Sequence, residues 1–330
     1  SPLMHNPLTR RELLSCSGNS FGAAVLACWL GSELSNAAEP DLNGGLHHRA
    51  KVKRVIQLFM NGGASPMDTF DYKPELKRLH GQNLGPKEKP EGFTGAVGSV
   101  MKSPFEFKQH GETGRWVSSV FPHQAQIVDE LAFLMAMTTK TNVHGPASYM
   151  MNTGFMLPGF PCLGAWVSYA LGNLADNLST FVVLPDSRGL PYNQKANLSC
   201  GFLPAKHQGT LVNAASQTPI PDLFADAQYK FARGSADQDT VALLQQLNRQ
   251  HAASHPDDSR LEARIAAGEL AAKMQLSAPE AFDLSRETKE PHAAYGLDQK
   301  ETEDFGRRCL LGRRLLERGT RFVQVWSGPQ

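Results

Sequence analysis

Apolar residues are grouped into short runs that predict strands. The run KVKRVIQLFM at 51–60 is largely apolar, rich in β-branched residues and closed by NGG, which predicts a buried strand that ends in a loop. LAFLMAM at 131–137 predicts a second buried strand, STFVVLP at 179–185 a third and TRFVQVW at 320–326 a fourth. All four runs have few polar positions, which is typical of strands covered on both faces.

Other segments have the spacing of helices. Pro146 suits a first helical position and Gly154 a position just past the end, and the segment 163–172 predicts a helix ended by Gly172. Apolar positions also recur at helical spacing within 115–130, with a break at Pro122. Two later helices are predicted in a polar helical region that includes 261–276, and at 301–319, which ends at Gly319.

The alternation of strands and helices predicts an α/β fold with a mainly parallel sheet flanked by helices. Ligands of such folds bind beyond the carboxyl ends of the strands, so the loops that follow the strands are the first places to search. The segment from 186 to about 224 is rich in Gly, Pro and Asn and predicts a long ordered loop. Since the sequence stops at VWSGPQ, just after the last strand, we expect the domain to be incomplete at its C-terminus.

Composition excludes several classes of protein. The chain has 330 residues, 41% hydrophobic residues and a formal net charge of +1, which indicates a globular protein and argues against nucleic acid as a partner. No apolar run reaches the length of about 20 residues that a transmembrane span requires. The widely spaced Cys162, Cys200 and Cys309 favour buried free thiols over a zinc ribbon or a disulfide framework.

The first 38 residues resemble a twin-arginine export signal. Arg10 and Arg11 precede a modestly apolar run at 21–30, and small residues at 36–38 offer a cleavage site. This predicts an exported protein, located in the periplasm or cell envelope, with one domain at 39–330. An amphipathic N-terminal helix and a lipoprotein signal ending at Cys28 are the alternatives.

Three loops contain candidate chemical groups. In the first, MNGGASPMDTFDYKP, Asp68 and Asp71 place two carboxylates on one short segment, which could hold a divalent cation. The same residues are also common in turns and helix caps, and that reading stays open. In the second, HGPASYMMNTG, His144 precedes a helix N-terminus, where backbone N–H groups favour an anion. The histidine could bind metal, accept a proton or contact substrate, or be an ordinary loop residue.

The third loop is CGFLPAKHQGT, which places Lys206 and His207 near glycines. Lys206 could neutralise an anion, although a solvated loop lysine is the ordinary alternative. The chain contains no GxSxG, GxxxxGK[ST] or HExxH motif, so serine-hydrolase, P-loop and zincin interpretations lack their minimal parts.

Five motifs in order resemble the DUF1501 family of exported, planctomycete-type proteins: LFMNGGASPMDTFDYKPEL, HGPASYMMNTG, PCLGAWVSYALG, GFLPAKHQGT and FGRRCLLGRRLLERGTRFVQVW. The resemblance covers nearly the whole chain. It implies an alkaline-phosphatase-like fold, distantly similar to sulfatases, with one or two divalent metals (Zn, Ca or Mn) at the carboxyl ends of the strands and a nucleophile at a helix N-terminus.

This resemblance also implies roles for particular residues. Alignment with the sulfatase nucleophile segment places His144 at the nucleophile position, which excludes formylglycine chemistry. Asn61 stands where the superfamily has a metal-binding aspartate, so Asp68 becomes the expected first metal ligand and Asp71 a supporting carboxylate. Together with Asn61, we expect Lys206 and His207 to contact substrate; the remaining ligands would lie beyond residue 330.

The resulting hypothesis is a metal-dependent hydrolase of an anionic phosphate or sulfate ester, with either a small molecule or a polysaccharide as substrate. The rival hypothesis is a non-catalytic binding or cell-envelope protein that retains the fold. A phosphoglycerate-mutase-like transferase is a third possibility, but its serine nucleophile has no counterpart at His144.

Overall fold

The computed structural model describes residues 51–83, 98–216, 219–220, 235–255, 258, 261, 264–266, 268–270 and 280–328. The chain divides into two units, Ser1–Lys53 and Arg54–Gln330, and every element below belongs to the second. The proposed export segment at 1–38 therefore lies outside the described residues, as does much of the helix predicted at 261–276.

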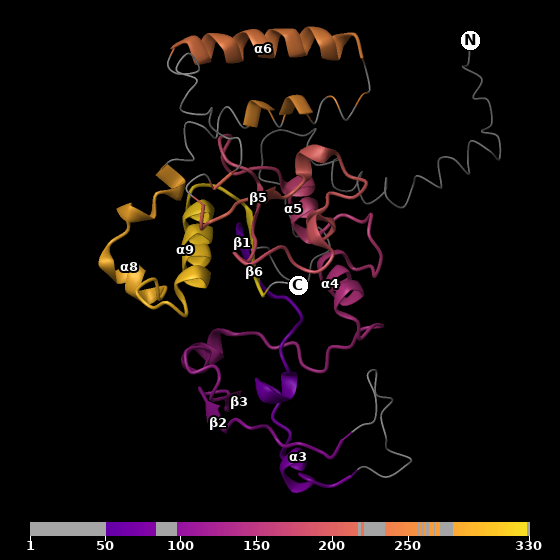
Figure 1. Cartoon of the computed structure of the whole chain (residues 1–330), viewed down its shortest axis with the longest axis vertical. Helices are drawn as coiled ribbons and strands as arrows, with labels where there is room; N and C mark the ends of the chain where they lie inside the picture. The colour runs from indigo at the N-terminus through magenta and orange to yellow at the C-terminus, as the bar shows by residue number, and fades with distance from the viewer. Residues whose placement is uncertain are drawn as a thin grey trace, which may run out of the picture. The chain divides into compact units, whose positions relative to one another are not determined.

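The main sheet contains four parallel strands in the order β1-β6-β4-β5, and a separate antiparallel pair is formed by β2 and β3 (Figure 1). The strands are β1 (Val55–Met60), β2 (Phe107–His110), β3 (Arg115–Ser118), β4 (Phe181–Leu184), β5 (Thr210–Leu211) and β6 (Phe322–Ser327). The helices are α3 (Pro74–Arg78), α4 (His144–Thr153), α5 (Leu163–Leu171), α6 (Ser235–Ala253), α8 (Lys289–Ala294) and α9 (Glu303–Glu317). Short 3-10 helices are η1 (Pro66–Asp68), η2 (Gln124–Glu130), η3 (Gln194–Leu198), η4 (Ala205–His207) and η5 (Leu284–Arg286).

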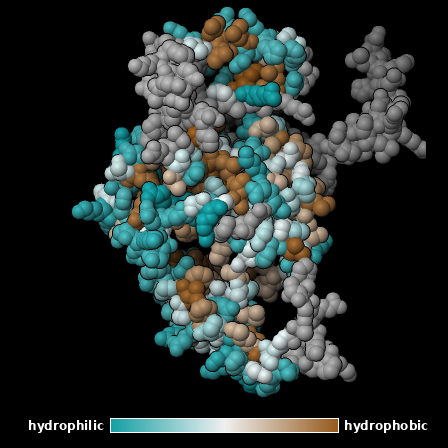
Figure 2. All heavy atoms as spheres, in the orientation of Figure 1, coloured by the Kyte–Doolittle hydropathy of each residue, from teal (hydrophilic) through white to brown (hydrophobic). Residues whose placement is uncertain are grey.

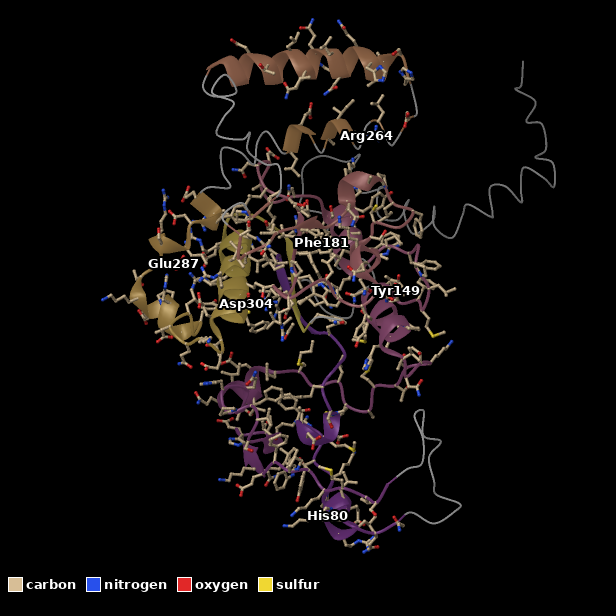
Figure 3. The ribbon with its side chains drawn as sticks, in the orientation of Figure 1. His80, Tyr149, Phe181, Arg264, Glu287 and Asp304 are labelled. Atoms are coloured by element: carbon tan, nitrogen blue, oxygen red, sulfur yellow. The ribbon has the colours of Figure 1, made fainter. Side chains whose placement is uncertain are left out.

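Helices cover both faces of the main sheet, so the predicted α/β class is confirmed (Figure 1). On one face, Ala165 of α5 packs with Phe181 and Trp326, and Phe181 is labelled in Figure 3. On the other face, Leu311 and Leu315 of α9 pack against the opposite side chains of β4 and β6. Because alternate residues of a strand face opposite sides, β4 and β6 have to be apolar on both faces, as their sequences are.

The central strands and the clearest helices lie where the sequence predicts them. The run at 179–185 contains β4, the run at 320–326 overlaps β6, and 301–319 contains α9. Gly154 follows α4 with φ 82°, a left-handed conformation that favours glycine. The helix itself begins at His144, two residues earlier than the position assigned to Pro146.

The prediction of a buried first strand is wrong in one respect. β1 is an edge strand, and the exposed fractions of Ile56, Leu58 and Met60 are 40%, 56% and 52%. The run at 131–137 is not a strand, and its Leu134 and Met137 are 79% and 72% exposed. An apolar run becomes a strand only where a neighbouring strand satisfies its backbone, and none lies beside this segment in the described part of the chain.

The segment 115–130 is helical only after the break at Pro122, where it forms the 3-10 helix η2, and its first part forms the strand β3. β3 pairs with β2, and Val117, Ala125 and Val128 form a small separate core with Phe70 and neighbouring aromatic residues. The helical prediction is wrong for 115–118, because a hairpin depends on pairing with a second segment, which helical spacing within one segment does not reveal.

Two further observations concern surfaces and thiols. None of the helices in the described ranges is long and apolar enough to cross a membrane. Leu243, Leu244 and Leu247 of α6 are at least half exposed, and Figure 2 shows other apolar residues on the surface.

All three described cysteines are free, as the sequence predicts. Cys162 and Cys200 are buried and Cys309 is half-buried.

Candidate functional site

The carboxyl ends of β1, β6 and β4 meet at one edge of the main sheet, which we call the carboxyl edge. It consists of Asn61, Gly62, His144, Asp186, Arg188, Tyr192 and Gly328. Parallel strands in register bring the loops that follow them to the same edge, so residues far apart in the sequence become neighbours.

Hydrogen bonds connect the loops along this edge. Asn61, after β1, donates from Nδ2 to the carbonyl oxygen of Gly328, after β6, at 3.3 Å. The backbone N–H of Gly328 donates to Oδ2 of Asp186, after β4, at 2.9 Å. The three loops are therefore joined in the order β1, β6, β4, the order of the strands in the sheet.

Asp186 is the best-satisfied carboxylate in this network. Its Oδ1 accepts hydrogen bonds from the backbone N–H and Nε of Arg188 at 3.0 and 2.8 Å, and its Oδ2 accepts one from a terminal guanidinium nitrogen at 3.0 Å. Arg308, only 4% exposed, approaches from α9 at 3.5 Å. The hydrogen bonds from the Arg188 side chain are the main reason why the pKa of the Asp186 carboxyl lies well below its usual range. Burial raises this pKa, but the backbone N–H groups of Arg188 and Gly328 and the charge of Arg308 lower it further.

Arg188 is an exposed cation at the carboxyl edge, where Asp186 and Asp304 offset its charge. Its Nε and one terminal nitrogen hold Asp186, while its side chain is 66% exposed. The guanidinium is thus anchored on one side and accessible on another. Such a fixed guanidinium is suited to the oxygens of phosphate, sulfate or carboxylate.

His144 lies at the N-terminus of α4 and is exposed. Its ring stacks on Tyr192, with centroids 5.1 Å apart and planes inclined by 14°. A methyl group added to Gly62 would lie 3.9 Å from His144 Cε1, which places the glycine turn after β1 beside the imidazole. Gly62 has φ 85°, so the turn itself requires glycine.

Polar contacts beneath α4 fix its orientation. Gln324 of β6 donates to Oδ1 of Asn152 at 2.6 Å, and Asn197 donates to the hydroxyl of Ser148 at 2.8 Å. Near the tip, Asn193 donates to the carbonyl oxygen of Gly145 at 2.7 Å. Ser148 and Asn152 are buried, so they position the helix and do not face a ligand.

Asp68 and Asp71 lie on the loop after β1 but have other partners. The side chains of Ser103 and then Ser65 donate to Asp68 and lower the pKa of its carboxyl. Asp71 forms an ion pair with Lys73 at 2.9 Å. Nowhere in the described ranges do three or more His, Cys, Asp or Glu side chains converge to hold a metal ion. These donors, taken as they stand, do not fit a metal centre.

Lys206 and His207 lie at the other end of the strands. Their 3-10 helix, η4, precedes β5, so they belong to the amino edge of the sheet and not to the carboxyl edge. The Nδ1 of His207 lies 2.9 Å from the hydroxyl oxygen of Ser168 in α5. Burial and then Lys206 lower the pKa of the His207 imidazole. The structure therefore brings His144 and Asn61 to one edge and separates Lys206 and His207 from them.

Sequence analysis missed Asp186, Arg188, Tyr192 and Gly328. Asp186 and Arg188 follow the predicted strand at 179–185 directly, so the rule that ligands bind beyond strand ends could have found them. Tyr192 reaches His144 only through the fold, and no local pattern marks it.

The chain matches a known protein family. The family model described as a protein of unknown function (DUF1501) matches residues 52–329. The chain belongs to this family. Neither a curated protein nor a solved structure matches it. The DUF1501 match spans the whole carboxyl edge, from Asn61 to Gly328.

Proposed function

We propose that this DUF1501 protein binds a phosphate or sulfate ester at the carboxyl edge and hydrolyses it. The observation that carries the proposal is the edge itself: loops after three parallel strands are hydrogen-bonded together beside an exposed arginine and an exposed histidine at a helix N-terminus. Arg188 would contact the charged group of the ester, and the N–H groups at the start of α4 would add to its binding.

His144 would take part in the chemical step. Its imidazole accepts a proton from a water molecule while the water oxygen forms a bond to phosphorus or sulfur. The bond to the ester oxygen breaks, and the proton passes to the departing alcohol. The products are the alcohol and inorganic phosphate or sulfate, so atoms and charge balance.

Binding and turnover test separate parts of this proposal. We expect inorganic phosphate or sulfate to bind the full chain, with Arg188→Ala weakening binding about tenfold. Arg286→Ala is the matched control, because Arg286 is 58% exposed, pairs with the surface acids Asp283 and Glu280, and lies in neither proposed site. An equal loss of anion affinity in both variants would show that Arg188 is not part of the binding site.

For turnover, aryl phosphates and aryl sulfates are the probes. We expect His144→Ala to lower kcat about 100-fold with little change in anion affinity. His123→Ala, an exposed histidine ahead of η2, is the control. A wild-type chain that hydrolyses neither probe, with or without added metal, would contradict the catalytic part.

Metal dependence is a separate proposal. A Zn, Ca or Mn ion held by Asp68 and Asp71 requires both carboxylates to exchange their present contacts with Ser103, Ser65 and Lys73. Metal analysis of the purified chain and of a double Asp68→Asn, Asp71→Asn variant tests it directly: equal metal content in the two would exclude these ligands.

A binding protein without catalysis is the second candidate. The specific observation in its favour is that Asp186, the carboxylate at the centre of the edge, is fully engaged by Arg188, Arg308 and Gly328. Anion affinity that depends on Arg188, combined with no turnover in the wild type, would establish it. Export through residues 1–38 stays a proposal in either case, tested by replacing Arg10 and Arg11 with lysine in a reporter fusion.

A further inference from the structure

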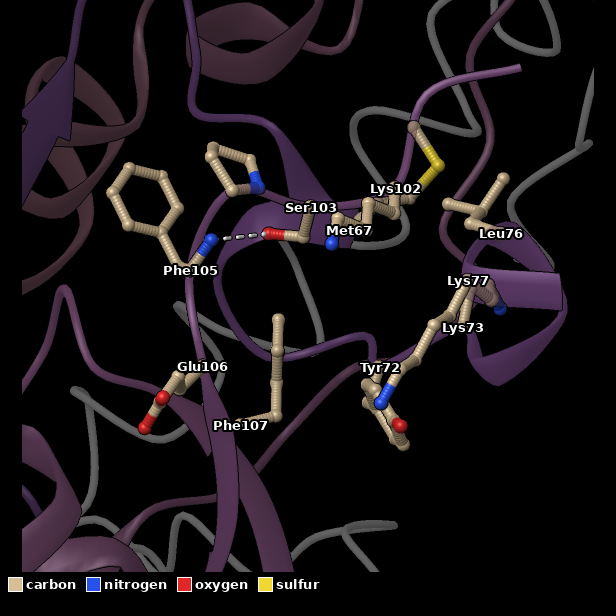
Figure 4. A pocket seen from close by; sticks show the side chains of 11 residues that line it. Met67, Tyr72, Lys73, Leu76, Lys77, Lys102, Ser103, Phe105, Glu106 and Phe107 are labelled. Atoms are coloured by element: carbon tan, nitrogen blue, oxygen red, sulfur yellow. Dashed lines mark hydrogen bonds between the residues drawn. The ribbon is translucent and has the colours of Figure 1, made fainter. Parts of the chain in front are cut away.

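A pocket separate from the carboxyl edge lies between α3 and the segment that leads into β2. Its cavity volume is about 490 Å³, within the range of small-molecule sites. Figure 4 shows Lys73 and Lys77 coming from the α3 side, and Lys102, Ser103 and Phe105 from the facing segment. We call it the lysine pocket.

Positive charge dominates the wall of the lysine pocket. Among the residues that the structure describes, three lysines and one acid, Glu106, line it. Lys73 is compensated by Asp71 at 2.9 Å, whereas Lys77 and Lys102 have no ion-pair partner among the residues that the structure describes. Because like charges around one cavity repel, a bound anion would relieve this repulsion.

Aromatic rings form the other part of the wall. Tyr72 packs against Trp116 and Phe107, with centroids 4.5 and 5.1 Å apart. Phe105 is 43% exposed. The packed rings keep their orientation without a ligand, so contact with them costs little conformational entropy.

We propose that the lysine pocket binds an anionic saccharide. The ammonium groups of Lys77 and Lys102 contact sulfate, phosphate or carboxylate substituents, and the aromatic rings contact the apolar face of a sugar ring. The lysine ammonium is a compact charge with three rotatable donors, so it suits substituents at variable positions better than the rigid, planar guanidinium of arginine does.

The test measures binding of the full chain to immobilised saccharides. Chondroitin sulfate carries both sulfate and carboxylate groups and polygalacturonate carries carboxylates alone, so binding of the first without the second indicates recognition of sulfate. Neutral dextran reports aromatic contact alone, and oligothymidylate reports any polyanion. The test variant is Lys77→Ala with Lys102→Ala. Its control is Lys140→Ala with Lys300→Ala, two exposed lysines elsewhere, which removes the same charge.

We expect one of the anionic saccharides to bind, and the Lys77, Lys102 variant to bind it about tenfold more weakly. The control should remain within twofold of wild type, and Phe105→Ala should weaken binding at high salt, where ionic contacts are screened. Equal losses in test and control variants, unchanged binding in the test variant, or equally tight binding of dextran or oligothymidylate would overturn the proposal. None of these outcomes bears on the carboxyl edge.

Discussion

Replacing Asp186 by asparagine removes the central charge of the carboxyl edge while keeping the shape of the side chain. The Asp186 side chain is 1% exposed and that of Arg308 is 4% exposed, so the change leaves a buried guanidinium without one of its acids. Removing one partner of a buried ion pair costs about 3–5 kcal/mol. Arg308 keeps Asp304 at 2.6 Å and the carbonyl oxygen of Trp326, so we expect the lower end, about 3 kcal/mol.

The dependence on pH gives this prediction a distinctive signature. The pKa of the Asp186 carboxyl is lowered in the folded state, chiefly by its hydrogen bonds to Arg188. Its contribution is therefore present above the unfolded pKa of about 4 and is lost as pH falls through the folded pKa. The stability gap between wild type and Asp186→Asn should be full at pH 7 and shrink below about pH 4.

Urea unfolding at 25 °C, followed at several pH values, measures this gap. Asp283→Asn is the control, because Asp283 also has a lowered pKa but pairs with Arg286 at the surface, where its side chain is 40% exposed. We expect the Asp283→Asn control to have the same free energy of unfolding as the wild type. An Asp186→Asn variant as stable as the control at pH 7, or a gap that widens in acid, would refute the reasoning.

Two further predictions concern packing and thiols. A methyl group at Gly306 of α9 would clash with the carbonyl oxygen of Tyr295, so Gly306→Ala should lower the free energy of unfolding by about 2 kcal/mol. A methyl group at Gly312 would meet only side-chain ends, at 3.2 Å or more, so Gly312→Ala should change the free energy of unfolding by less than about 1 kcal/mol. Equal effects of the two substitutions in urea unfolding would contradict this prediction. Burial raises the pKa of the Cys162 and Cys309 thiols to about 11, so a thiol reagent at pH 8 should label neither cysteine until denaturant is added. Rapid labelling of Cys162 or Cys309 in the native chain would contradict their placement.

The central strands of the main sheet are the part of the fold that the sequence predicts well. β4 and β6 pack on both faces, and their sequences are apolar apart from the buried Gln324 and the terminal Ser327 of β6. The exposed segment 131–137 has an equally apolar sequence. What separates them is a neighbouring strand, which depends on residues far away in the chain.

The same distinction explains which site residues could be predicted. His144 is marked locally, by Pro146 in the first turn of its helix and Gly154 just past the helix end, and Asn61 is marked by its position after a strand. Sequence alone does not separate Lys206 and His207 from these residues, because the two-residue strand β5 is too short to detect. Without β5, the edge to which their loop belongs cannot be assigned.

On the proposed function, an anion is the first ligand of this site and binds through the exposed guanidinium of Arg188. The one buried carboxylate there, Asp186, is already compensated by Arg188 and Arg308, so it offers little attraction to a cation. The exposed group that remains is the Arg188 guanidinium, next to loops whose backbone is fixed through Gly328. If a metal takes part, it has to be attracted by Asp68 and Asp71, or to arrive with the anion. Metal affinity of the resting chain should therefore depend on Asp68 and Asp71 and be insensitive to Arg188→Ala, whereas anion affinity should show the opposite dependence.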